Sequence, residues 1–153
     1  MIKILFVCRA NQCRSAMAEA LMQKMLDERA IYEIEIKSAG THARDGIRPL
    51  RKVLEVCEQR GIDISSHSSL ALTEELLKDS DIVLVMEKEQ VQSVIEKFPE
   101  AKEKVKMLSS YSKEYKDQDI IDPVGGSMLG FRTTFAILDE CVIGLLDDVL
   151  MTR

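Results

Sequence analysis

Residues 7–15 read VCRANQCRS and hold the residue types that could carry out chemistry: two cysteines five positions apart, followed by an arginine and a serine. In a short loop, successive backbone N–H groups can point inward and form a cradle for an anion. Arg14 adds a planar guanidinium that matches two oxygens of a phosphoryl group. The same positive field stabilises a thiolate at Cys8, to which Ser15 can donate its hydroxyl. These residues predict a nucleophilic thiolate beneath a bound phosphate.

Two other interpretations of the cysteines fit the residues less well. A structural zinc site needs four ligands, usually in two close pairs. Cys8 and Cys13 lack a second pair, because His42 and His67 stand in unrelated segments. Two ordinary core thiols would leave Arg14 buried beside them, which is costly without an anion. We therefore expect no metal and no other cofactor.

The best candidate for a proton donor is Asp122, in the stretch DIIDPVGGS at 119–127. Pro123 biases the residue before it away from helical backbone, and the two glycines favour a loop. The loop follows the last predicted strand by about a dozen residues, so we expect Asp122 on the same side of the molecule as Cys8.

Hydrophobic patterns predict the elements that must position these residues. We expect buried or alternating strands at 2–8, 32–40, 82–86 and 105–108. We expect helices at 15–29, 49–60, 72–81 (capped by Thr73), 88–97 and 128–150. The alternation predicts an α/β fold in three layers, a four-stranded parallel sheet with helices on both faces and a phosphate-binding loop after the first strand.

Composition limits the broad class of the protein. The 153 residues are 46% hydrophobic and 31% charged, without linker or repeat, which predicts a single domain over 1–153. No apolar stretch approaches the ~18 residues of a membrane span, and the N-terminal apolar run is too short for a signal peptide. We expect a cytoplasmic protein that does not bind membranes. The net charge of −5 argues against a nucleic-acid partner.

One stretch is basic, although the chain as a whole has a net negative charge. Between Gly40 and Lys52 the basic side chains outnumber the single acidic residue, Asp45; they are His42, Arg44, Arg48, Arg51 and Lys52. This stretch could attract an anionic phosphoprotein to the mouth of a site. It could equally be an ordinary solvated face, and the sequence leaves both interpretations open.

Several segments together resemble a known family, the low-molecular-weight protein tyrosine phosphatases, in the bacterial branch that includes protein arginine phosphatases. They are VCRANQCRSAMAE at the start, SAGT (38–41), GIDISSHSS (61–69), LTEELL with DIVLVM (72–86), FPEA (98–101) and the Asp-Pro pair at 122–123. The resemblance implies a phosphatase that forms a thiophosphate on Cys8, with Arg14 as phosphate clamp and Asp122 as general acid and then general base. It implies a phosphorylated protein or a small phosphate ester as partner, and we expect a monomer or weak dimer.

The resemblance also assigns supporting roles. The phosphate loop and its supports would be Arg9, Ala10, Asn11, Gln12, Cys13, Ser15, Ser38 and His67. Asn11 would hold the loop in shape, with Ser38 and His67 as its hydrogen-bond partners beneath it. Cys13 would be the redox partner, able to form a reversible disulfide with Cys8. The substrate rim would be Gln12, His42 and Val124.

Three departures from the family pattern leave the substrate open. Ala10 stands where the family usually has glycine, which matters if that position needs a positive φ. Val124 replaces a residue that is often aromatic, and Gln12 replaces the threonine typical of arginine phosphatases. Phosphotyrosine, phosphoarginine and small esters therefore all remain candidates.

Two other functions are compatible with the same scaffold. Arsenate reductase chemistry would need two further cysteines near the third strand, yet no cysteine lies between Cys57 and Cys141. A catalytically inactive phosphate-binding module is the other alternative.

Overall fold

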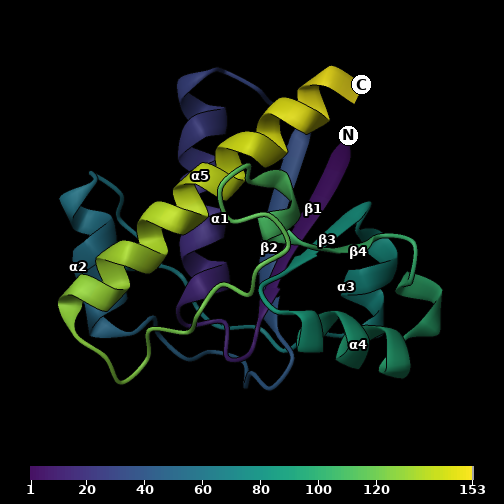
Figure 1. Cartoon of the computed structure of the whole chain (residues 1–153), viewed down its shortest axis with the longest axis horizontal. Helices are drawn as coiled ribbons and strands as arrows, with labels where there is room; N and C mark the ends of the chain where they lie inside the picture. Colours follow the sequence, from purple (N-terminus) through teal and green to yellow (C-terminus); the bar gives the residue numbers. More distant parts are fainter. Residues whose placement is uncertain (153) are drawn as a thin grey trace.

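The centre of the molecule is a parallel sheet of four strands, counted over residues 1–152, the part of the chain that the computed structural model describes. The strands are β1 (Ile2–Cys8), β2 (Ile34–Gly40), β3 (Ile82–Val85) and β4 (Val105–Met107). They lie in the order β2-β1-β3-β4 (Figure 1). The predicted four-stranded parallel sheet is confirmed, with β2 beginning two residues later than expected.

Helices cover both faces of this sheet, which confirms the predicted three layers. They are α1 (Arg14–Glu28), α2 (Arg51–Gln59), α3 (Glu74–Asp79), α4 (Lys88–Lys97) and α5 (Met128–Thr152), with short 3-10 turns η1 (Pro99–Ala101) and η2 (Leu108–Tyr111). In Figure 1, α1, α2 and α5 lie on the left of the sheet, and α3 and α4 lie on the right. As predicted, Thr73 caps α3, because its hydroxyl accepts a hydrogen bond from Leu76 N at 3.2 Å.

The apolar run of β1 is explained by its place in the middle of the sheet. Ile4 and Phe6 belong to the larger core beneath α1, α2 and α5. Leu5 and Val7 point the other way, into a smaller core with α3 and α4. A strand buried on both faces has no solvent-facing positions, so it is apolar throughout and does not alternate.

The carboxyl end of β1 is the point at which the order of the strands reverses. β1 pairs with β2 on one side and with β3 on the other. The connection to β2 runs through α1 on one face, and the connection from β2 to β3 passes α2 on that same face before it reaches α3 on the other face (Figure 1). Ligands of open parallel sheets bind at such a switch point. Residues 9–13, which follow Cys8, therefore begin at the position where a site is expected.

Within residues 1–152, no helix combines the length with the apolar character needed to cross a membrane.

Helix α5 packs so closely on η2 that a glycine is required at the contact. A Cβ at Gly144 would overlap the carbonyl oxygen of Tyr111 and lie 3.0 Å from its carbonyl carbon. Gly130, on the same helix, has open space where a Cβ would lie, with nothing within 4 Å. These two glycines therefore offer a matched pair for testing the contact.

We predict that Gly144→Ala lowers the free energy of unfolding by about 1–3 kcal/mol, because backbone atoms of Tyr111 must move to admit the methyl group. Gly130→Ala should be neutral or stabilising by up to about 1 kcal/mol, since alanine favours helix. Urea unfolding followed by circular dichroism measures both. Equal stability of the two variants would contradict the close contact.

Candidate active site

The loop that follows Cys8 is held against the end of β2. Thr41 N donates to Cys8 O at 2.9 Å, and His42 N donates to Arg9 O at 2.8 Å. Gly40 makes this approach possible, because a Cβ there would lie 2.6 Å from Arg9 O and 3.0 Å from the carbonyl carbon of Ala10. The SAGT motif thus supplies a glycine where the backbone of the loop comes closest.

Asn11 combines a strained backbone conformation with side-chain hydrogen bonds that hold the loop in place. Its φ is 58°, in the left-handed region, whereas Ala10 is not among the described residues with positive φ. The buried Asn11 side chain donates to Ser15 Oγ at 2.7 Å and to Ser38 Oγ at 2.9 Å, and it accepts from Leu70 N at 3.0 Å. Alanine at position 10 therefore meets no left-handed requirement, and the strain lies one residue later.

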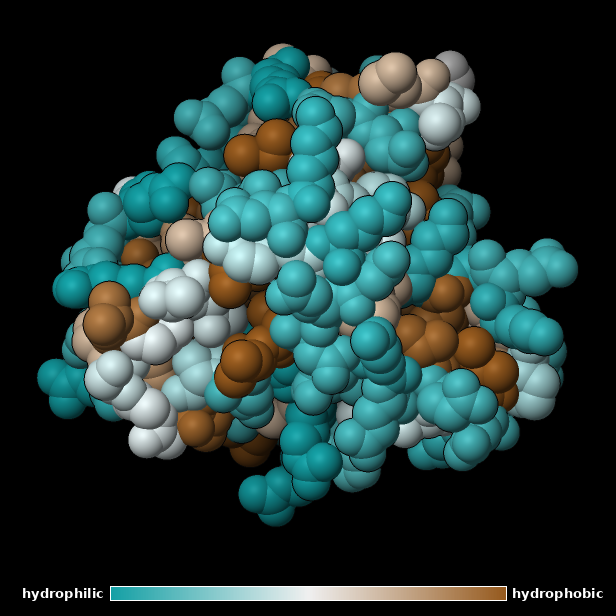
Figure 2. All heavy atoms as spheres, viewed as in Figure 1, coloured by the Kyte–Doolittle hydropathy of each residue, from teal (hydrophilic) through white to brown (hydrophobic). Residues whose placement is uncertain are grey.

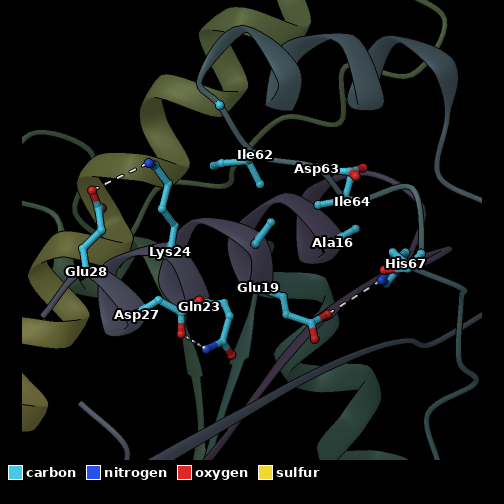
Figure 3. A pocket seen from close by; sticks show the side chains of 13 residues that line it. Ala16, Glu19, Gln23, Lys24, Asp27, Glu28, Ile62, Asp63, Ile64 and His67 are labelled. Carbon is cyan, nitrogen blue, oxygen red and sulfur yellow. Dashed lines mark hydrogen bonds and ion pairs between the residues drawn. The ribbon is translucent and has the colours of Figure 1, made fainter. Parts of the chain in front are cut away.

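Glu19 and His67 support the loop from behind. His67 Nε2 lies 2.9 Å from Asn11 O, and His67 Nδ1 lies 3.8 Å from Glu19 Oε1. Figure 3 shows the two side chains pointing toward each other, and both line a cavity of about 550 Å³. Ser38 Oγ donates to the same Glu19 oxygen at 2.5 Å. Sequence reasoning missed Glu19, although its place four residues after Ser15 puts both on one face of α1.

Ser15 lies next to the sulfur of Cys8. The two side-chain atoms, Cys8 Sγ and Ser15 Oγ, are 2.9 Å apart, and Ser15 is fully buried. Because Asn11 donates to Ser15 Oγ, the hydroxyl proton remains for the sulfur or for the more distant Ala39 O at 3.4 Å. The arrangement suits a hydroxyl that stabilises a thiolate.

Arg14 is a buried charge with partners from two other segments. Its side chain is 2% exposed; Nη1 lies 2.9 Å from Glu87 Oε2 and donates to Ile120 O at 2.6 Å. Nη2 lies 3.8 Å from Asp122 Oδ2. A buried guanidinium needs such compensation. Glu87 was missed by sequence reasoning, yet it lies two residues after the carboxyl end of β3, the strand next to β1, where functional side chains gather.

These side chains surround one cavity of about 230 Å³. It is lined by Cys8, Arg9, Ala10, Gln12, Cys13, Arg14, Leu50, Asp122 and Val124. Asp122 thus reaches the same cavity as Cys8, although more than a hundred residues separate them. His42 is not in this group and lines a separate cavity with Thr41 and Phe98. Leu50 was not anticipated; its place just before α2 carries no chemical signal in the sequence.

The loop that carries Asp122 is anchored along its length. Ile120 N donates to Met86 O at 2.9 Å, and Asp119 Oδ1 accepts from Lys88 N at 2.9 Å. Near the other end, Lys52 Nζ donates to Gly126 O at 2.7 Å. Asp122 Oδ1 also accepts from Val124 N at 3.0 Å. The carboxylate is therefore presented by a fixed segment and stays half-exposed, with 40% of its side-chain surface accessible.

Gln12 joins the loop to the other wall of the mouth. Its Nε2 donates to Arg48 O at 2.9 Å, and its backbone oxygen accepts from Leu50 N at 3.3 Å. The side chain is therefore part of the rim of the cavity and ties the loop to the segment that precedes α2.

The other three cysteines are held as thiols by burial. Burial raises the pKa of Cys57 and of Cys141 to about 12. It also raises the pKa of Cys13 strongly, and negative charge on Cys8 and Asp122 adds to the shift. All four cysteines are free in this structure.

One cavity thus brings together the loop after β1, a thiol, a buried arginine and a carboxylate. On an α/β fold, this combination defines the class of cysteine-dependent phosphatases. Residues 3–152 match the family described as Low molecular weight phosphotyrosine protein phosphatase. The chain belongs to this family, which confirms the resemblance found in the sequence.

Known relatives are similar along almost the whole chain. The Protein-arginine-phosphatase of Bacillus subtilis is 35% identical over 137 residues, which are 90% of this chain and 89% of that protein. The Low molecular weight protein-tyrosine-phosphatase Ptp of Acinetobacter johnsonii is 33% identical over 91% of this chain and 92% of its own length. The solved YwlE arginine phosphatase from Geobacillus stearothermophilus superimposes with a TM-score of 0.90 at 32% identity, covering 99% of this chain and 95% of that one.

A further solved structure bears on the chemistry. A YwlE arginine phosphatase mutant with a phosphorylated active-site serine has a TM-score of 0.92 at 30% identity, and the match covers 99% of this chain and 98% of that chain. That protein holds a phosphoryl group on a side chain of its active site, as covalent catalysis requires.

We predict that Asn11→Gly lowers the free energy of unfolding by about 2–3 kcal/mol, because three buried hydrogen bonds of the side chain are lost. Asn11→Ala should cost a further ~1–2 kcal/mol, since alanine must also adopt the left-handed backbone. Urea unfolding of both variants separates the side-chain contribution from the backbone contribution. If Asn11→Ala were as stable as Asn11→Gly, the left-handed backbone at this position would be disproved.

We predict that iodoacetate at pH 8 alkylates the native protein once, at Cys8. Because the pKa of Cys57 and Cys141 is about 12, only about one molecule in 10⁴ carries either thiolate at that pH. The raised pKa protects Cys13 in the same way. Peptide mapping by mass spectrometry identifies the adduct, which inorganic phosphate should suppress. Adducts at Cys57 or Cys141 at a comparable rate would contradict this; in denaturant all four cysteines should react.

Proposed function

We propose that this chain hydrolyses phosphorylated side chains of proteins, phosphotyrosine or phosphoarginine, through a thiophosphate on Cys8. The observation that carries the proposal is the convergence on one cavity of Cys8 and Arg14, from the loop after β1, with Asp122, which lies more than a hundred residues further along the chain. Family membership and the phosphorylated serine of the related YwlE structure support the same chemistry.

In the first step, Cys8 Sγ attacks phosphorus in line with the bond that leads to the substrate side chain. An S–P bond forms and the P–O bond of phosphotyrosine, or the P–N bond of phosphoarginine, breaks. Asp122 gives its proton to the departing atom. Arg14 and the N–H groups of the loop stabilise the charge on the phosphoryl oxygens through the transfer. The partners of Arg14, Glu87 and Ile120, keep the guanidinium oriented.

In the second step, Asp122 takes a proton from a water molecule whose oxygen attacks phosphorus. The S–P bond breaks, and its electron pair returns to Cys8 as a thiolate while inorganic phosphate leaves. Ser15, 2.9 Å from the sulfur, stabilises that leaving thiolate by hydrogen bonding. Asp122 ends with the proton that it lost in the first step, so the cycle closes without any external reductant.

The mouth of the cavity supports a protein side chain as substrate. Leu50 and Val124 supply apolar surface, and Gln12 supplies a polar rim. Apolar walls suit the phenyl ring of phosphotyrosine and the methylene stem of phosphoarginine alike. The two substrates differ in the group that leaves, so direct comparison of rates is the way to rank them.

The positions of the remaining cysteines argue against arsenate reductase chemistry. That reaction passes electrons through two further thiols. Cys57 and Cys141 are both fully buried in the core between α2, α5 and the sheet. Neither lies in the cavity that holds Cys8. The oxidation partner available at the site is Cys13, which suits reversible protection of Cys8.

We predict that Cys8→Ser reduces turnover of an aryl phosphate by at least ~10⁴-fold while inorganic phosphate still binds, because the cradle and Arg14 remain. Asp122→Asn should reduce it by about 10²–10⁴-fold, the usual contribution of a general acid. Phenolate release and calorimetric phosphate titration measure the two properties.

Release of inorganic phosphate from matched phosphotyrosine and phosphoarginine peptides ranks the two substrates. Cys57→Ala serves as a control, since a core thiol outside the cavity should leave turnover per folded molecule unchanged. Full activity of Cys8→Ser would overturn the proposed function, and activity of Asp122→Asn equal to that of the wild type would overturn the assignment of the acid.

A further inference from the structure

The segment 121–124 forms a narrow wall between two hollows. Asp122 and Val124 line the catalytic cavity with Cys8. Ile121 and Pro123, the alternate residues of the same segment, line a second and larger hollow of about 570 Å³. One short stretch of chain therefore contributes one set of side chains to the catalytic cavity and the other set to its neighbour. We call the second hollow the flank groove.

The flank groove presents apolar side chains to solvent. Ile121 is 77% exposed and Leu129, in the first turn of α5, is 70% exposed. Ile137, Pro123 and Tyr115 also line it, from three different segments. The polar part of the lining comes from Gln118, Asp119, Ser127, Thr133 and Thr134. Figure 2 shows hydrophobic side chains at the surface over the region where the chain enters α5. Exposed aliphatic residues that gather around a hollow are typical of a binding surface.

Gly130 is a position at which substitution can fill the flank groove. It lines the hollow, and a Cβ added there would meet nothing within 4 Å. Glycine costs helix stability relative to alanine by about 1 kcal/mol, and no close backbone contact demands it here. This contrasts with Gly144, where the contact with Tyr111 does demand a glycine.

The wall between the two hollows is anchored, so the flank groove is formed before any ligand binds. Ile120 N bonds to Met86 O at 2.9 Å, and Thr134 Oγ1 donates to Ile121 O at 3.4 Å from α5. Lys52 holds the far end of the loop through Gly126 O. A preformed hollow avoids the entropic cost of ordering a loop on binding.

We propose that the flank groove binds an apolar side chain of the substrate polypeptide, one to three residues from the phosphorylated residue. The inference rests on the proposed function, because it takes the catalytic cavity as the place of the phosphoryl group. A polypeptide whose phosphorylated side chain enters that cavity must lay its neighbouring residues on the rim. Extended chain advances about 3.3 Å per residue, so a side chain within three positions is displaced by up to about 10 Å.

The two sides of the mouth differ, which favours the flank of a peptide over an occupant unrelated to catalysis. The side toward α2 is mixed: Arg9 and Gln12 supply charged and polar groups, and Leu50 supplies its large apolar side chain. The side across the wall is the apolar flank groove. A peptide seated in the catalytic cavity would therefore meet different chemistry on its two flanks. We expect the apolar residue of the peptide to lie in the flank groove beside Pro123. This determines which flank of the phosphorylated residue faces the groove.

The test uses two series of peptides, with phosphotyrosine or phosphoarginine at the centre and serine elsewhere. In each series a single leucine is placed at every position within three residues of the centre. We expect leucine on one flank to raise kcat/KM of the wild-type protein roughly five- to tenfold over the all-serine peptide, which corresponds to partial burial of one leucine. Leucine on the other flank should have little effect.

Two variants remove the flank groove without touching the catalytic cavity. Gly130→Phe fills it, and Leu129→Ser removes an apolar wall. Both should bring the leucine preference down to within about twofold of unity, while kcat/KM for a small aryl phosphate stays unchanged. The matched controls are Gly130→Ala, which adds only a methyl group, and Ile143→Ser, which replaces an exposed aliphatic residue further along α5. Both controls should keep the preference.

Each outcome decides the question. The proposed role of the flank groove is overturned if the leucine preference persists in Gly130→Phe and Leu129→Ser. It is also overturned if the wild type turns over the peptides without any leucine preference; neither result affects the proposed function. If Gly130→Phe and Leu129→Ser change sedimentation but keep the leucine preference, the surface binds a second copy of the chain. That result also overturns the proposed peptide site. Failure of the wild type to turn over the aryl phosphate and both peptide series overturns the proposed function itself.

Discussion

The buried guanidinium of Arg14 is the constraint on which the rest of the site depends. A positive charge that is 2% exposed must be compensated inside the protein, and here the compensation comes from Glu87 and from the carbonyl of Ile120. Glu87 is the cap of α4, and Ile120 begins the segment that carries Asp122. One ion therefore joins the phosphate loop, the end of β3 and the acid-bearing loop, three segments that are far apart in the chain.

The second constraint is the left-handed backbone at Asn11, which holds the loop from below, whereas Arg14 holds the groups around its mouth. Asn11 ties the loop down onto Ser15, Ser38 and, through its carbonyl, His67. A strained residue persists when its surroundings over-determine it. The hydroxyl of Ser15, which takes part in that anchoring, is also the group beside the sulfur. The bonds that maintain the shape of the loop thus also orient the thiolate.

The sequence predicted the fold well, and Cys8, Arg14 and Asp122 meet at one cavity as it indicated, because the elements and motifs involved leave strong local signals. A continuous apolar run, a helix stripe or a Cys-x5-Arg-Ser loop is visible within a dozen residues. Glu19, Glu87 and Leu50 were missed because their roles exist only through contacts with distant segments. His42 was expected at the rim as part of the basic stretch between Gly40 and Lys52, but it lines a separate cavity with Phe98. Membership of a basic stretch does not determine the direction of a side chain.

The difficulty of predicting the substrate has a physical reason. Asn11, Arg14 and Ser15 are buried and bonded to their neighbours, so exchanging any one of them leaves an uncompensated charge or an unpaired polar group. The side chains of Val124 and Leu50 are apolar and take part in no such network, and Val124 is 55% exposed; the Gln12 side chain donates one bond, to Arg48 O. These rim residues can change at little cost in stability, and each change alters which side chain fits. Substrate selectivity is therefore determined by the rim residues, where the fold constrains the sequence least. The buried and hydrogen-bonded residues beneath the rim stay constant.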